Sequence, residues 1–216
     1  MKVLDLFSGI GGFSLGLEKV GFETVAFCEI EEYCQAVLRK HWPDTPIYDD
    51  VRSITGEQLR ADGHGGIDVV TAGFPCQDIS IAGYGAGLDG ERSGLWFEVA
   101  RIVGDIRPRW VMLENVAALL GRGMGRVIGD LAAIGYDAQW EVISASAIGA
   151  PHRRQRIWIV AYDSRKRCEG VKPFTVSRQQ AFSWCEDVRR ASDIPDRPHL
   201  YASKLCRSGN GLRKRL

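Results

Sequence analysis

Short apolar stretches alternate with longer amphipathic stretches from the amino end of the chain to about Tyr162. The short stretches are rich in β-branched residues, which is typical of buried strands, and the longer ones repeat apolar residues at helical spacing. We expect strands at 3–7, 24–28, 67–72, 110–113, 138–144 and 156–162, and helices at 13–20, 31–41, 95–106 and 123–134. This alternation predicts βαβ units and hence an α/β fold with a doubly wound, mostly parallel sheet.

Composition and charge divide the chain into two parts. Its 216 residues, 45% of them hydrophobic, suffice for one substantial core. Residues 1–150 hold 12 basic and 21 acidic residues, a net charge of −9, whereas residues 151–216 hold 16 and 6, a net charge of +10. A basic segment beside an acidic body is typical of a polyanion-binding face, although a solvated tail has the same composition. We expect a domain at 1–162 and a short basic segment at 163–216.

No apolar stretch approaches the ~20 residues that span a bilayer, and no signal peptide begins the chain. The sequence therefore predicts a cytoplasmic protein without a membrane partner. Its six cysteines are scattered, with no Cys-x-x-Cys pair and no histidine at metal-ligand spacing. We expect neither a bound metal nor a disulfide framework.

One cysteine has a distinctive setting. Cys76 lies in Gly73-Phe74-Pro75-Cys76-Gln77, directly after the expected strand at 67–72. That places it on a loop at the carboxyl end of a strand, where open α/β sheets hold their reactive groups. A single cysteine in an intracellular protein is more often a small buried apolar residue than a nucleophile, so its meaning depends on what accompanies it.

A glycine-rich turn, Ser8-Gly9-Ile10-Gly11-Gly12, separates the first strand from the first helix. Glycines there permit positive φ and close approach of a ligand to the backbone, although a purely structural turn has the same composition. Glu29 follows about 20 residues later, at the end of the second strand, where an acid can accept hydrogen bonds from ribose hydroxyls. The turn lacks a phosphate-binding lysine and Asp5 precedes it, which favours a cofactor with a cationic centre over a dinucleotide.

Two further segments carry polar residues at expected strand ends. Glu114 and Asn115 follow the apolar strand at 110–113, where a helix start or a turn is the alternative interpretation. Arg154 and Arg156 flank Gln155 ahead of the last strand, so strand alternation directs both to one side. A solvated arginine pair would show the same pattern.

Taken in their order along the chain, the glycine turn, the Cys76 segment, the Glu114 segment and the Arg154–Arg156 segment closely resemble those of the DNA (cytosine-5) methyltransferases. The resemblance runs from Met1 to about Tyr162. It implies a Rossmann-like domain of the class I methyltransferase type that transfers a methyl group from S-adenosylmethionine to carbon 5 of cytosine in double-stranded DNA. Cys76 would add to carbon 6 of a flipped cytosine, and Glu114 would hydrogen-bond or protonate ring nitrogen 3. Ser80 and the glycine-rich segment at 83–90 would close over the flipped base.

The resemblance also implies roles for the remaining site residues. Arg154 and Arg156 would line the catalytic pocket, and Asn115 would brace the cysteine loop. Asp50 falls where the family places an acid against the adenine amino group, although Asp49 is adjacent and spacing does not choose between them. The expected cofactor-binding residues are Asp5, Phe7, Ser8, Gly9, Gly11, Gly12, Glu29, Ile30, Asp50, Val51, Pro75 and Leu95.

The sequence departs from the family beyond this domain. Members continue with a variable target-recognition region and a final helix, whereas Gly209-Asn210-Gly211 lies too close to Leu216 to form that helix. We therefore expect a carboxyl-terminally truncated member, with a second chain as the candidate source of the absent motifs. A non-catalytic DNA-binding or cofactor-binding remnant and an RNA cytosine-5 methyltransferase stay open, since phosphate contacts do not distinguish DNA from RNA.

Overall fold

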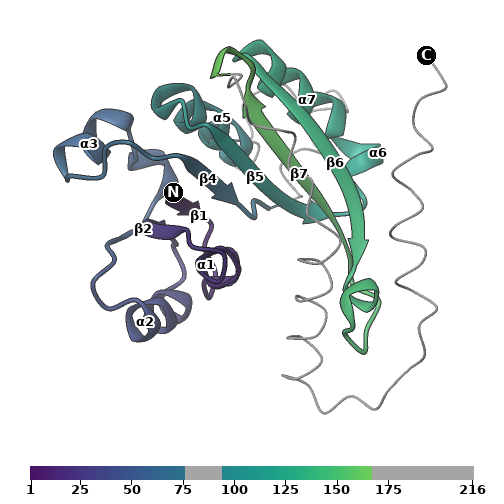
Figure 1. Ribbon diagram of the computed structural model, residues 1–216, viewed down its shortest axis with the longest axis horizontal. Coiled ribbons are helices and arrows are strands. Elements are labelled where there is room, and N and C mark those ends of the chain that lie inside the picture. The colour runs from purple at the N-terminus through teal and green to yellow at the C-terminus, as the bar shows by residue number, and fades with distance from the viewer. Residues whose placement is uncertain (76–93, 167–216) are drawn as a thin grey trace. The chain divides into compact units, whose positions relative to one another are not determined.

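The structure of the protein is a computed structural model, and residues 1–75 and 94–166 of it are described. A seven-stranded sheet with the order β3-β2-β1-β4-β5-β7-β6 forms its centre (Figure 1). β1, β2, β3, β4 and β5 run parallel, and β7 pairs antiparallel with β5. The strands are β1 (Lys2–Leu6), β2 (Glu23–Cys28), β3 (Ile47–Tyr48), β4 (Val69–Ala72), β5 (Trp110–Val116), β6 (Tyr136–Ser144) and β7 (Gln155–Asp163).

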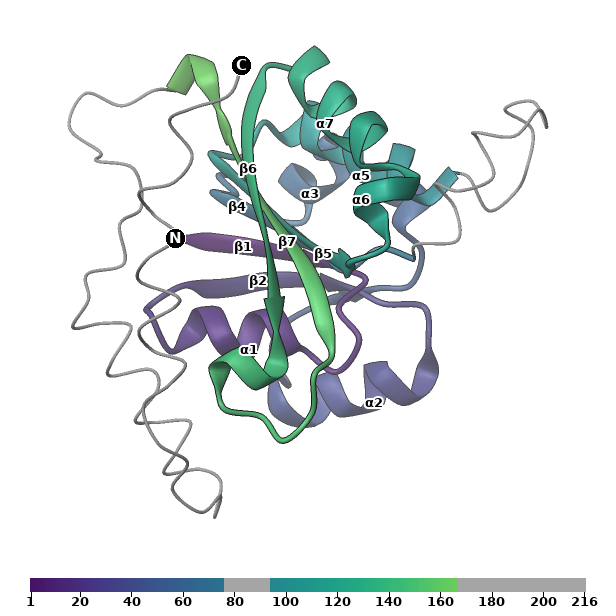
Figure 2. The same cartoon turned by 90° about the vertical axis from the view of Figure 1, so that its right-hand side faces the viewer.

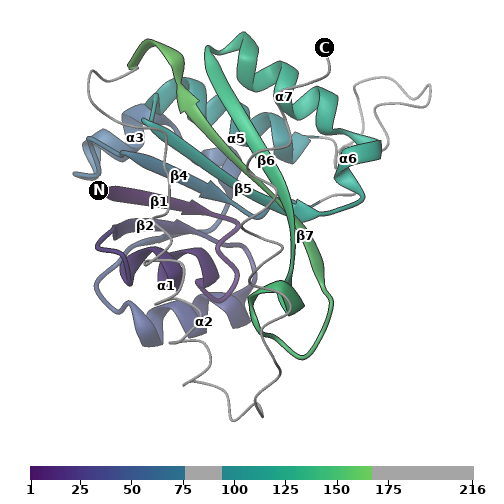
Figure 3. The same ribbon diagram turned by 45° about the vertical axis from the view of Figure 1, so that its right-hand side comes forward.

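Helices cover both faces of the sheet. Figure 2 shows α1 and α2 on one face and α3, α5 and α7 on the other, and Figure 3 shows the same division from an intermediate angle. The helices are α1 (Gly12–Glu18), α2 (Glu32–His41), α3 (Gly56–Ala61), α5 (Gly94–Ile106), α6 (Leu119–Arg122) and α7 (Met124–Ala133). Short 3₁₀ helices are η1 (Val51–Ser53), η3 (Ala145–Ile148) and η4 (Ser164–Lys166). The expected α/β, doubly wound fold is confirmed.

Strand alternation produces two apolar clusters. Leu4, Leu6 and Val70 belong to the larger cluster, which also contains buried side chains of α5 and α7. Val3 and Val69, one residue away along the same strands, pack instead with Leu17 of α1. Because successive side chains of a strand point to opposite faces, β1 and β4 are apolar on both faces and lie fully inside.

The observed elements differ from the predicted ones in two respects. β3 and α3 are too short to produce a recognisable period, and neither was expected. β5 is longer than expected and extends through Glu114 and Asn115 to Val116, because β7 supplies pairing partners as far as that residue. The helix-start and turn interpretations of Glu114 and Asn115 are therefore wrong.

Contacts along the chain define two compact units. The first comprises residues 1–143 and 155–170, and the second comprises 144–154 and 171–216. In the second unit only 144–154 are described, so the expected boundary after Tyr162 stays a prediction. Within residues 1–75 and 94–166, no helix is long and apolar enough to span a membrane.

The start of α1 requires glycine for two reasons. Gly11 has φ +86°, and a Cβ there would lie 2.5 Å from Cζ3 of Trp42 and 3.1 Å from Cδ2 of Leu38. Trp42 is fixed in turn by its ring contact with Phe27 and by the hydrogen bond that its indole N–H donates to Glu18. The turn after β1 is thus packed tightly against the end of α2.

Replacing Gly11 by alanine should therefore destabilise the fold by about 2–5 kcal/mol, the sum of left-handed strain and overpacking. Gly9→Ala is the matched control, because Gly9 also has positive φ, +55°, but a Cβ there meets nothing within 4 Å. We expect Gly9→Ala to lose only about 1 kcal/mol. Urea unfolding followed by tryptophan fluorescence measures both values, and equal losses would contradict the packing argument.

Candidate functional site

The strand order reverses direction between β1 and β4, and at such a point open α/β sheets hold a ligand crevice outside the carboxyl ends of their strands. The chain leaves β1 through Phe7 and leaves β4 through Gly73. A Cβ built on Gly73 would lie 3.7 Å from Oε2 of Glu114 and 4.0 Å from the carbonyl oxygen of Phe7. The turn after β1, the loop after β4 and the end of β5 therefore converge at one point.

Glu29 holds the glycine turn in place. Its Oε2 accepts a hydrogen bond from the Gly9 N–H at 2.7 Å, and its Oε1 accepts one from the Glu31 N–H at 2.9 Å. The side-chain amide of Gln35 donates to the Glu29 carbonyl oxygen at 2.6 Å. A carboxylate has about four acceptor positions, so two backbone bonds leave acceptors for ligand hydroxyls.

The ligand-facing side of the turn is open and partly apolar. A Cβ added at Gly9 or Gly12 would meet nothing within 4 Å, in contrast to one at Gly11. Ile30, next to Glu29, is 66% exposed, and Phe7 is half-buried with φ 53°. Carboxylate acceptors beside open backbone and an exposed aliphatic side chain suit a nucleoside, whose sugar is polar and whose base has an apolar face.

Ser8 and Asp5 lie beneath the turn rather than on its open side. The Ser8 hydroxyl donates to the Asp5 carbonyl oxygen at 2.6 Å and accepts from the Cys28 N–H at 3.3 Å. The Asp5 carboxyl is fully buried and accepts from the hydroxyls of Thr71 at 2.5 Å and Ser14 at 2.9 Å. Asp5 thereby joins β1, β4 and α1.

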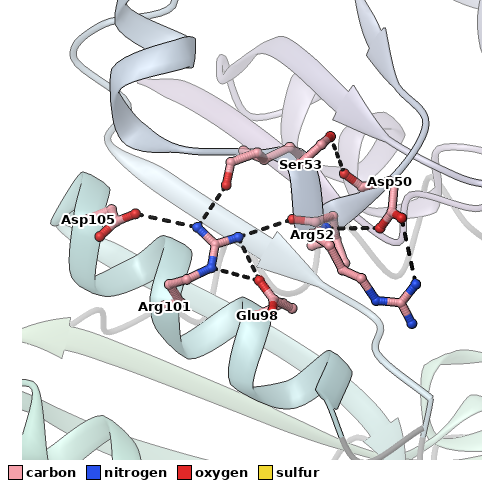
Figure 4. Close-up of polar contacts among 8 residues, drawn as sticks. Asp50, Arg52, Ser53, Glu98, Arg101 and Asp105 are labelled. Atoms are coloured by element: carbon pink, nitrogen blue, oxygen red, sulfur yellow. Dashed lines mark hydrogen bonds and ion pairs between the residues drawn. The ribbon is translucent and has the colours of Figure 1, made fainter. Parts of the chain in front are cut away.

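The two neighbouring acids after β3 have different partners. Asp49 accepts from the Gln35 side-chain amide at 2.9 Å, which links it to Glu29. Asp50 caps η1 by accepting from the Arg52 N–H at 2.9 Å, and its other carboxylate oxygen lies 3.6 Å from the Arg52 guanidinium (Figure 4). Val51 is buried in the main core and anchors the turn that Asp50 begins.

Glu114 and Asn115 are adjacent in β5 and therefore serve opposite faces. Oε1 of Glu114 forms an ion pair with Nε of Arg156 at 2.8 Å, with each side chain about a quarter exposed. Asn115 is buried and donates through Nδ2 to the Phe74 carbonyl oxygen at 2.8 Å. Its Oδ1 accepts from the Val116 N–H at 2.8 Å. Asn115 thus holds the loop that leads toward Cys76.

The other expected site residues are placed as follows. Pro75 is exposed at the end of a described segment, and Leu95 lies in α5 against the main core. Arg154 belongs to the second compact unit, so Arg156 is the arginine described beside Glu114. Cys76, Ser80 and the segment at 83–90 lie outside the described residues.

Two residues that position the site were not expected. Gln35 is buried on α2, and Arg101 of α5 contacts the turn that follows Asp50. A polar residue on the apolar face of an amphipathic helix was the available signal for Gln35. Arg101 resembles an ordinary surface arginine in sequence, because its partners include backbone carbonyls from a distant segment.

Residues 1–207 match the family model described as C-5 cytosine-specific DNA methylase. The chain belongs to this family. It is 39% identical over 169 residues to the type II methyltransferase M2.BsuMI of Bacillus subtilis (strain 168), which covers 74% of this chain and 42% of that protein. It is 33% identical over 214 residues to the type II methyltransferase M.Bsp6I of Bacillus sp. (strain RFL6), covering 95% of this chain and 65% of that protein.

Among solved structures, the Dnmt2 methyltransferase of S. pombe shares the fold, with a TM-score of 0.65 and 17% sequence identity. The alignment covers 93% of this chain and 58% of that one. The chain therefore spans 42% to 65% of the length of these three relatives.

The buried Asp5 carboxyl predicts a pH-dependent stability. Burial raises the pKa of Asp5 from its ordinary value of 3.8 to about 7. Between these values the unfolded chain has lost this proton while the folded chain keeps it, so stability falls as pH rises from about 4 to 7. A shift of this size corresponds to ~4 kcal/mol.

Asp5→Asn removes this titration. The stability of the variant relative to the wild type should rise by up to ~4 kcal/mol between pH 4 and pH 7 and stay constant above that. Urea unfolding at a series of pH values measures the difference. A flat curve for Asp5→Asn would show that the carboxyl ionises normally in the folded protein.

Proposed function

We propose that this chain carries the cofactor-binding and catalytic part of an enzyme that methylates carbon 5 of cytosine in DNA. The observation that carries the proposal is the convergence of the Glu29-held glycine turn, the Asn115-held loop and the Glu114–Arg156 pair. Membership of the cytosine-specific DNA methylase family supports this reading of the crevice. The substrate is double-stranded DNA, in keeping with the type II methyltransferases among its relatives.

The cofactor of the proposed reaction is S-adenosylmethionine, and the residues present fit it. Glu29 has acceptors left for both ribose hydroxyls, and exposed Ile30 offers an apolar surface to the adenine. The open backbone at Gly9 and Gly12 leaves room for the methionine portion. Asp50, at the start of η1, is the acceptor for the adenine amino group. When bound, the cofactor supplies an electrophilic methyl group on a sulfonium.

Cytosine is a poor nucleophile at carbon 5, so the proposed reaction begins with covalent activation of the ring. The Cys76 thiolate adds to carbon 6, and the displaced electron pair makes carbon 5 enamine-like. Glu114 faces ring nitrogen 3, where it hydrogen-bonds or protonates the base as the adduct forms. After carbon 5 has accepted the methyl group, loss of its proton and elimination of the thiolate restore the aromatic ring.

Arg156 orients Glu114 in this scheme. Its guanidinium holds Oε1, while Oε2 lies toward Gly73 and the loop that precedes Cys76. Arg156 also adds positive charge beside the base carbonyl, which favours the electron-rich adduct. Asn115 fixes the Phe74 carbonyl oxygen and so sets the direction in which the chain continues toward Cys76.

Removing Glu29 should weaken cofactor binding. Glu29→Ala deletes the ribose acceptors and releases the Gly9 N–H, so the dissociation constant for S-adenosylmethionine should rise by a factor corresponding to roughly 1–3 kcal/mol. Isothermal titration calorimetry with the purified chain measures this change. Glu23→Ala, at the exposed opposite end of β2, is the control and should bind normally. If Glu29→Ala bound S-adenosylmethionine as tightly as the wild type, the assignment of the cofactor site to Glu29 would be wrong.

The covalent step is tested by trapping. Duplex DNA with 5-fluorocytosine at the target position should form an adduct that survives denaturation, because fluorine at carbon 5 blocks the proton loss that releases the enzyme. The chain with S-adenosylmethionine should yield the adduct, and Cys76→Ser should yield none. Cys34→Ser, on α2, is the control and should trap as the wild type does. Peptide mapping of the adduct to another cysteine would refute the assignment.

A further inference from the structure

Asp50 begins a very short structural element. The 3₁₀ helix η1 contains three residues, Val51–Ser53. The Asp50 carboxylate caps it by accepting from the Arg52 N–H, and the Asp50 backbone carbonyl oxygen accepts from the Ser53 hydroxyl. Such a turn has few internal hydrogen bonds and does not fix its own position. The direction of the Asp50 carboxylate therefore depends on what holds the turn from outside.

Two kinds of contact hold η1 against α5. The side chains of Val51 and Ile54 are buried in the main core, which fixes the depth of the turn. Their carbonyl oxygens both accept from Arg101 of α5, at 3.3 Å from Nη2 and 2.8 Å from Nη1 respectively. One planar guanidinium thus donates to both ends of the turn. These bonds fix the rotation of the turn, in addition to the depth that the apolar side chains fix.

The guanidinium is itself oriented by two acids one helical turn away on either side. Glu98 contacts Arg101 at Nε and Nη2, at 2.7 and 2.6 Å, and Asp105 lies 3.5 Å from Nη1. Both are on α5, as Figure 4 shows. The side chain is about one third exposed, so these pairs contribute little to stability. They do keep the donors of Arg101 directed at the turn.

We propose that Arg101 is a positioning residue for recognition of the adenine base. It holds η1 so that the Asp50 carboxylate meets the exocyclic amino group of the cofactor. This inference rests on the proposed function, in which Asp50 is the acceptor for that group. Arg101 touches neither cofactor nor base in this scheme, and its effect is confined to the adenine edge.

Arg101→Met tests the proposal, because methionine retains the aliphatic bulk and removes every donor. The probes are S-adenosylhomocysteine and S-inosylhomocysteine, which differ at position 6 of the base by an amino group against a carbonyl oxygen. The wild type should bind the adenine compound more tightly, since Asp50 accepts from an amino group and repels a carbonyl. Arg101→Met should lose about tenfold in affinity for S-adenosylhomocysteine and leave S-inosylhomocysteine nearly unchanged.

Two further variants separate positioning from general damage. Arg101→Lys retains one donor group and should recover part of the preference for adenine. Arg126→Met removes a comparable helix arginine, paired with Asp130 on α7, and should leave the preference intact. Calorimetry gives the affinities, and thermal unfolding of each variant shows whether it is folded.

Equal weakening of both compounds by Arg101→Met and Arg101→Lys would overturn the proposal and leave Arg101 with a purely structural role. Unchanged discrimination in both variants would overturn it as well. If the wild type bound neither compound, the proposed function would fail together with the inference. If the wild type bound both equally well, the assignment of Asp50 would fail while the cofactor site at Glu29 stood.

Discussion

The reversal of strand order between β1 and β4 is the constraint on which the site depends. Because the strands that follow β1 and β4 along the chain are added on opposite sides of this pair, the carboxyl ends of β1 and β4 form the switch point at which open α/β sheets bind ligands. Both strands must be buried on both faces, and the apolar residues of β1 and β4 meet that requirement. Glu29 and Glu114 lie at the carboxyl ends of β2 and β5, and antiparallel β7 brings Arg156 to the same edge from its amino end.

Buried polar residues fix the loops around the site, whose positions apolar packing alone does not determine. Asp5, Gln35 and Asn115 are all buried, and each satisfies its polar atoms by bonding to a segment far away in sequence. Replacing such a residue leaves a backbone or side-chain partner unsatisfied, which makes the arrangement specific as well as stable. The open groups at Gly9 and Ile30 can then stay available for a ligand.

The sequence predicts the sheet, its main helices and the glycine turn, because periodicity and turn residues are local properties. It does not predict that Glu114 and Asn115 lie inside β5, since their strand conformation depends on pairing with β7. The roles of Gln35 and Arg101 are equally hidden, because their partners Asp49 and Ile54 are brought near only by the fold. Cys76 was recognised from its motif, and its side chain lies outside the described residues.

Because Glu114 and Asn115 are adjacent in β5, the register of this strand decides which of the two side chains faces the site. One faces the crevice while the other faces the interior, as required of successive residues in a strand. A slip of β5 by a single position would exchange the two: a carboxylate would enter the interior and an amide would face the crevice. Under the proposed function, a one-residue insertion or deletion in this strand would therefore abolish activity even in a molecule that kept its sheet.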